Sequence, residues 1–125
     1  MHPQPVVSDA MPPALGPYSQ AVRVGDLLFV SGQAGLDPVT GAVASGGFAG
    51  EARQAFANVA QVLEASGSSL SQVAKVTVFM ASADDFAALN ELFAEHFPTA
   101  PPTRSCPVVQ LPRGLLISIE AIAAA

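Results

Sequence analysis

The sequence has few charged residues and a single cysteine. Of its 125 residues, five are basic and ten are acidic, so charged residues make up 12% of the chain. Soluble proteins usually carry about 25%. Cys106 has no second cysteine to pair with, which excludes an intrachain disulfide and a zinc site built on clustered cysteines. His2 and His96 lie far apart with no ligand spacing, so we expect no metal site.

The chain has few basic residues and no long apolar segment, which argues against nucleic acid and membrane as partners. The net charge is −5, and five scattered basic residues form no patch that neutralises a run of phosphates, so we expect no nucleic acid. No apolar run approaches the roughly 20 residues of a membrane helix. Residues 1–13 have neither the basic nor the apolar region of a signal peptide. We therefore expect a cytoplasmic protein with no membrane partner.

Half of the residues are apolar, which excludes an intrinsically disordered chain. The length suits one domain, and we expect residues 1–125 to form it. A domain of this size exposes much of its surface. Because so few charges are available to cover that surface, we expect another subunit to cover part of it in a homo-oligomer.

The order of periodic segments predicts an α+β fold. Residues 1–13 are rich in proline and form a predicted irregular arm. The pattern then predicts the order ββαβαββ, with a mixed sheet and two helices on one face. The predicted strands are Ser19–Val24, Leu27–Ser31, Val73–Met80, Arg104–Leu111 and Leu115–Ala123; the predicted helices are Glu51–Ala65, with Gly67 as its C-terminal cap, and a segment from a cap at Ser82 or Asp84 to about His96.

Several polar residues stand where this pattern favours apolar ones. Asn90 falls on or beside the apolar stripe of Phe86, Leu89, Phe93 and Phe97 in the second helix, where an Asn is commonly a structural hydrogen-bonding group. Arg104 has no acidic sequence neighbour, and an arginine fork binds a carboxylate with two hydrogen bonds. The alternative for Arg104 is a surface or interface salt bridge.

Three more such residues come at the C-terminal end. Cys106 shares a strand face with Arg104, and free cysteines usually pack as small apolar groups. No histidine is placed to activate it, so no covalent mechanism is predicted. Ser118 and Glu120 point the same way from an otherwise apolar strand, where Glu120 suits acid–base chemistry or an intersubunit ion pair. Together these residues can line one small polar pocket for a small anionic substrate.

The chain resembles the Rid family of reactive intermediate deaminases, also called the YjgF family, over about residues 14–123. Each matching motif is short, but in this order the set is highly specific. The motifs are Gly16-Pro17-Tyr18-Ser19-Gln20-Ala21, Phe29-Val30-Ser31-Gly32-Gln33, Pro38-Val39-Thr40-Gly41, Gln54 with Asn58, Val76-Thr77-Val78-Phe79, Asp85-Phe86 with Asn90, Pro102-Thr103-Arg104-Ser105-Cys106, Leu111-Pro112 and Ile119-Glu120-Ala121-Ile122-Ala123.

The resemblance implies a chorismate-mutase-like fold and a homotrimer with ligand clefts between subunits. It also implies hydrolysis of 2-imino acids, or of their 2-aminoacrylate-type enamine tautomers, to 2-keto acids and ammonia without a cofactor. Carried over by position, Arg104 resembles the residue that holds the substrate carboxylate, and Cys106 the pocket cysteine. Tyr18, Ser31 and Gly32 match cleft-lining positions of the neighbouring subunit, and Asn90 matches a pocket position.

The sequence departs from the family at the residue that holds the attacking water. Active members usually have Glu-x-Glu-Ala near the end, and Ser118 stands at the first Glu, while Glu120 matches the second. Two alternatives to an imine deaminase therefore stay open. One is a small-carboxylate binding module with little turnover, and the other is a pathway deaminase for a larger substrate such as 2-aminomuconate. Ribonuclease roles have also been associated with the family, and the acidic charge balance argues against one here.

Overall fold

The computed structural model describes residues 1–125, which form one mixed sheet and two α-helices. The six strands lie in the order β1-β2-β3-β6-β4-β5, and every neighbouring pair is antiparallel except β4 with β5. The strands are β1 (Gln4–Pro5), β2 (Ala21–Val24), β3 (Leu27–Ala34), β4 (Val73–Met80), β5 (Thr103–Ser105) and β6 (Ile117–Ala124). The helices are α1 (Gly47–Ala65) and α2 (Phe86–His96), with short 3₁₀ turns η1 (Leu70–Gln72), η2 (Ala83–Asp85) and η3 (Pro112–Gly114).

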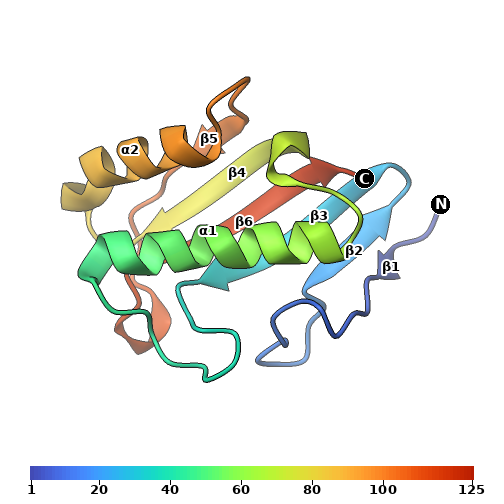
Figure 1. Cartoon of the computed structure of the whole chain (residues 1–125), viewed down its shortest axis with the longest axis horizontal. Coiled ribbons are helices and arrows are strands. Elements are labelled where there is room, and N and C mark those ends of the chain that lie inside the picture. The colour runs from blue at the N-terminus through green and yellow to red at the C-terminus, as the bar shows by residue number, and fades with distance from the viewer.

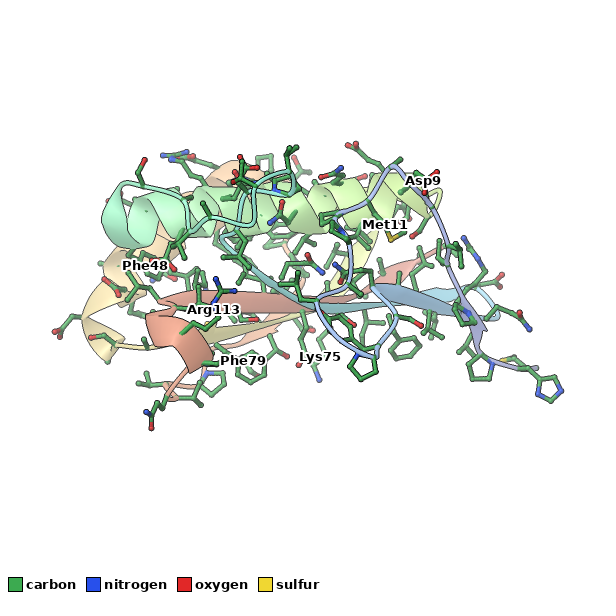
Figure 2. The ribbon with its side chains drawn as sticks, turned by 90° about the horizontal axis from the view of Figure 1, so that it is seen from below. Asp9, Met11, Phe48, Lys75, Phe79 and Arg113 are labelled. Carbon is green, nitrogen blue, oxygen red and sulfur yellow. The ribbon has the colours of Figure 1, made fainter.

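Both helices cover the same face of the sheet, as the sequence predicts (Figure 1). In the side view of Figure 2 the helices form one layer and the sheet the other, while Lys75 and Phe79 project from the sheet on the side away from the helices. We call this uncovered side the open face. Neither helix is long and apolar enough to cross a membrane.

The predicted N-terminal hairpin is confirmed. Val24 pairs with Leu27, which leaves Gly25 and Asp26 as a two-residue loop, and Gly25 has φ of +56°, a value that glycine adopts without strain. The prediction of an irregular arm over residues 1–13 is wrong at one point. Gln4 and Pro5 pair with β2 as a short edge strand, because backbone pairing there needs no apolar pattern.

Helix α1 begins four residues before the predicted Glu51. Phe48 lies in this extra turn and is buried, so its burial stabilises a segment whose glycines disfavour a helix. The predicted C-terminus is confirmed: the helix ends at Ala65, and Gly67 follows with φ of +83°. In the second helix, Ser82 caps the η2 turn by accepting a hydrogen bond from the Asp84 N–H, and α2 itself starts at Phe86.

The strand predicted over Arg104–Leu111 is wrong beyond Ser105. Pro107 has no N–H to give to the ladder, so β5 stops after three residues. The chain nevertheless stays beside β4, because the Met80 N–H donates to the Pro107 carbonyl and the Val109 N–H donates to that of Met80. The closing strand begins at Ile117, two residues later than predicted.

The core lies between the helices and the covered face of the sheet. Strand β6 alternates as predicted, with Ile117, Ile119 and Ala121 buried against the helices and Ser118 and Glu120 on the open face. Strand β4 alternates in the same register, because Val78 pairs with Ile119 and Thr77 pairs with Glu120. This alternation decides which predicted site residues can meet.

Candidate functional site

Arg104 lies at one edge of the sheet and is held against aromatic rings of α2. It pairs with the buried residue Val76, so its side chain leaves the sheet on the covered face. Its guanidinium carbon lies 4.8 Å from the ring centre of Phe93 and 5.4 Å from that of Phe86. These contacts orient the cation without using its hydrogen-bond donors.

The donors of Arg104 have no partner within the chain. The one ion pair of the chain joins Arg53 to Glu95, and the only arginines that donate side-chain hydrogen bonds are Arg23 and Arg53. A half-buried guanidinium with free donors can bind a carboxylate through two parallel hydrogen bonds. Of the alternative, a surface or interface salt bridge, the structure excludes a bridge within the chain.

Cys106 lies near this cation, and Asn90 lies on the helix whose Phe86 and Phe93 contact it. Cys106 packs against the core, and this burial raises the pKa of its thiol, while the nearby Arg104 opposes the rise. A raised pKa disfavours the thiolate that a nucleophilic cysteine needs. Asn90 is exposed and lies beside the apolar stripe, one helical turn from both Phe86 and Phe93. Phe86 is itself 45% exposed, so the stripe is narrower than predicted.

Ser31 and Gly32 form a bulge in β3. Val30 pairs with Ala121 and Gln33 pairs with Ile119, so two residues of β3 face the single residue Glu120. A bulge of this kind redirects side chains and often lies next to a functional site. Gly32 also allows close packing: a Cβ atom there would lie 2.9 Å from the Ser118 hydroxyl oxygen. The Ser31 hydroxyl donates to the Ser19 carbonyl at 2.6 Å, which fixes the bulge to the preceding loop.

A cavity of about 590 Å³ opens beside this bulge. It brings together three predicted site residues, Tyr18, Gly32 and Ser118. It also includes Arg113, which the sequence analysis did not select as a site residue. Arg113 stands in the η3 turn, and Figure 2 shows it at the end of the sheet below α1. In the sequence, Arg113 looks like any exposed arginine in a turn. Only its position beside the cavity marks it as a candidate site residue.

Two buried amides support the wall of this cavity and were also missed as site residues. The Gln20 side chain donates to the carbonyls of Pro12 and Pro13 at 3.0 and 3.1 Å. Gln33 donates to the Gln20 side-chain oxygen at 2.8 Å and to the Ser31 carbonyl at 3.1 Å. The bulge and the N-terminal arm are therefore joined through one amide pair. The available signal was a glutamine in β3, where the strand pattern favours an apolar residue.

Glu120 lies apart from this cavity. It borders a separate hollow of about 130 Å³ on the open face, together with Lys75, Thr77 and Phe29. Glu120 is exposed and pairs with no cation within the chain. Ser118 and Glu120 thus share a sheet face, as predicted, but open into different depressions.

The predicted residues do not converge on one pocket within a single chain. Arg104 and Cys106 lie on the covered side at the β5 edge, whereas Ser118 and Glu120 lie on the open face of β6, two strands away. Neighbouring strands are about 4.8 Å apart. A small imino acid cannot span both the distance and the sheet. No three His, Cys, Asp or Glu side chains gather where they can hold a metal ion.

The chain thus carries two partial sites, and comparison with known proteins shows the family of the chain. A profile described as Endoribonuclease L-PSP matches residues 8–125. The chain belongs to this family, the Rid or YjgF family. The match extends the resemblance read from the sequence by a few residues at each end, and confirms it.

Curated relatives and solved structures agree with this membership. A human protein named 2-iminobutanoate/2-iminopropanoate deaminase is 44% identical over 120 residues, covering 94% of this chain and 88% of the human one. The crystal structure of RidA from the Antarctic bacterium Psychrobacter has a TM-score of 0.92 at 40% identity, covering 98% of this chain and 99% of that one. The YjgF gene product of E. coli has a TM-score of 0.90 at 36% identity, covering 97% and 98%. The predicted fold class is confirmed.

Proposed function

We propose that this family member hydrolyses 2-imino acids, or their enamine tautomers, to 2-keto acids and ammonia. The observation that carries the proposal is the Arg104 guanidinium, which is oriented by two phenylalanine rings and keeps its donors free. A carboxylate is the group that such a fork binds best. The deaminase name of the human relative supports the imine as the reacting group.

The reaction needs little more than positioning. A water oxygen attacks the imine carbon, the carbon–nitrogen double bond becomes a single bond, and its electron pair takes up a proton. The resulting carbinolamine loses ammonia as the new hydroxyl loses its proton to form the keto group. Arg104 fixes the carboxylate next to the reacting carbon, and Cys106 lies beside it. Holding two reactants in place contributes much of the acceleration of such a step.

The groups that can assist the water lie on the other partial site. Ser118 and Tyr18 border the cavity with Gly32, beside the Ser31 bulge, and Glu120 lies on the same open face. Since Arg104 of the same chain lies on the opposite face, we propose that the site is completed by a neighbouring copy in a homotrimer. The partly exposed Leu27 and Phe29 on β3 support this arrangement, because apolar strand residues favour a covered face.

The test uses imines generated in the assay by an amino-acid oxidase and trapped by semicarbazide. The wild-type chain should lower semicarbazone formation from 2-iminobutanoate, because hydrolysed imine escapes the trap. Arg104→Ala should lose about ten- to a hundredfold of kcat/KM, since a charged hydrogen-bond pair is removed. Arg104→Lys should recover part of the lost kcat/KM, because lysine keeps the positive charge but not the two parallel hydrogen bonds of the guanidinium.

Arg53→Ala is the matched control, because the Arg53 guanidinium is already paired with Glu95 in an exposed bridge. It should leave trapping as in the wild type. Equal turnover by wild type and Arg104→Ala would exclude the proposed role of Arg104.

A second candidate function rests on Ser118. A serine lacks the carboxylate that active members use to hold water, so the chain can bind small carboxylates with little turnover. This reading predicts Arg104-dependent binding of 2-oxobutanoate in calorimetry, with imine decay at the buffer rate. Replacing Ser118→Glu should then create turnover in a chain that has none.

A further inference from the structure

The cavity beside the β3 bulge is larger than a short-chain imino acid requires. Its volume is about 590 Å³, and cavities of about 300–1,000 Å³ hold ligands much larger than 2-iminopropanoate. Its walls come from the N-terminal arm, the Leu36–Gly41 loop, α1 and the η3 turn. The space available is therefore that of a ligand larger than a short-chain imino acid.

Arg113 is the only cation that borders this cavity, and it has no acidic partner. Asp37 is the one acid there, and its carboxylate already accepts hydrogen bonds from the N–H groups of Val39 and Thr40 at 2.8 and 2.9 Å. These bonds, that of Thr40 most strongly, lower the pKa of Asp37. The carboxylate is therefore already hydrogen-bonded within its own turn. The Arg113 donors are left for an anion.

The backbone of Arg113 is unusual as well. Its φ of +60° places a residue other than glycine in the left-handed region, where a side chain costs energy. Gly114 follows with φ of +67°, so two successive residues turn the chain the same way. Strained residues of this kind concentrate at ligand sites.

The remaining polar groups of the cavity are neutral. The Gln33 side-chain oxygen accepts no hydrogen bond, and the Ser118 hydroxyl has no partner. The Tyr18 oxygen accepts from the Leu15 N–H at 3.1 Å and keeps its own proton to donate. One free cation among neutral donors and acceptors suits a single carboxylate group.

We infer that Arg113 binds a second carboxylate, so that the preferred substrates are imino acids with an acidic side chain. This inference rests on the proposed function, in which Arg104 of a neighbouring copy holds the first carboxylate. Such a dicarboxylate would lie with its reacting carbon near the bulge and its distal carboxylate at Arg113. Ser118 contributes here by being neutral, because a carboxylate in its place would repel that distal group.

The test compares 2-iminoglutarate, made from glutamate by its oxidase, with 2-iminobutanoate. The variants are Arg113→Gln, which removes the charge at similar length, and Arg113→Lys, which keeps it. Arg113→Gln should lower kcat/KM for 2-iminoglutarate about tenfold and leave 2-iminobutanoate within about twofold, while Arg113→Lys should recover most of the loss. Arg113→Asn, which tolerates positive φ, is a second charge-removing variant if the first does not fold.

A binding measurement separates failure of this inference from failure of the proposed function. If no imine is hydrolysed, the deaminase proposal fails, and calorimetry with 2-oxoglutarate and 2-oxobutanoate still tests Arg113. The inference predicts that Arg113→Gln weakens only 2-oxoglutarate, about tenfold. Equal effects on both ligands, no effect on either, or a wild type that binds both equally would overturn it.

Discussion

At the scale of single residues, the surroundings of each arginine decide whether its guanidinium binds within the chain or stays free for a ligand. Arg53 is paired with Glu95 at 2.8 Å in an exposed bridge, which contributes little to stability. Arg23 donates to the Ser66 carbonyl. Arg104 and Arg113 remain without acidic partners, one beside aromatic rings and one beside a cavity. In a chain with five basic residues, two free arginines at concave or aromatic positions point to anionic ligands rather than to structure.

Residue-scale reasoning also covers the buried amides. Replacing Gln20→Leu removes the donors for the Pro12 and Pro13 carbonyls and leaves a Gln33 donor without its acceptor. We expect the free energy of unfolding to fall by about 2–3 kcal/mol, because buried polar groups lose their partners. Urea denaturation followed by circular dichroism measures this loss.

Gln61→Leu provides the matched comparison. Gln61 also donates to a carbonyl of the arm, that of Ala10 at 2.8 Å, but this bond is exposed. Its loss should cost less than about 1 kcal/mol, since water replaces the missing donor. Equal losses in the two variants would contradict a special role for the buried pair.

At the scale of elements, irregularities place the site residues. The bulge in β3 moves Ser31 and Gly32 out of the regular ladder, and Pro107 ends β5 directly after Arg104 and Cys106. Both features interrupt strands that would otherwise be ordinary sheet. Their effect is to interrupt the ladder next to polar groups, where a ligand can reach them.

The Leu36–Val43 loop illustrates how an element depends on one carboxylate. The N–H groups of Thr40 and Val39 lower the pKa of Asp37 from its usual 3.8, so these bonds stabilise the fold above that pH. The contribution is lost as the pH falls through the lowered value, because protonation weakens the acceptor. Replacing Asp37→Ala should therefore lower the urea midpoint at pH 7, and the difference from wild type should shrink by pH 3. A difference that does not change with pH would show that the charge contributes nothing.

At the scale of the whole molecule, the sheet has one covered face and one open face. The covered face holds the core. The open face carries partly exposed apolar side chains, and the charged residues Lys75 and Glu120 lie between them. Arg104 lies on one side of the sheet and Ser118 on the other. The two partial sites can act on one small molecule only if different copies of the chain supply them.

The proposed assembly gives a whole-molecule prediction. Phe29 lies on the open face and is 41% exposed, so Phe29→Asp should place a charge in the proposed interface. We expect sedimentation to show a trimer for wild type and a single chain for the variant, with loss of Arg104-dependent turnover. Val7→Asp adds the same charge at a residue that is 92% exposed and should change neither property. A trimeric Phe29→Asp would exclude the open face as the interface.

The sequence by itself determined most of the local structure and the family to which the chain belongs. Periodicity predicted two helices on one face, the β4 bounds and the β6 alternation, because side-chain burial repeats every two or about 3.6 residues. Arg104, Cys106 and Ser118 were singled out because a sparse set of polar residues stands out in an apolar chain. These signals depend only on neighbours along the chain.

Only the tertiary structure decided which of these residues meet. Strand order and register put Arg104 and Ser118 on opposite faces, although the sequence pattern predicted that both line one pocket. The same folding brought Arg113 and the amide pair of Gln20 and Gln33 to one cavity from three separate segments. Their roles come from contacts between distant residues, and no pattern of neighbouring residues encodes such contacts.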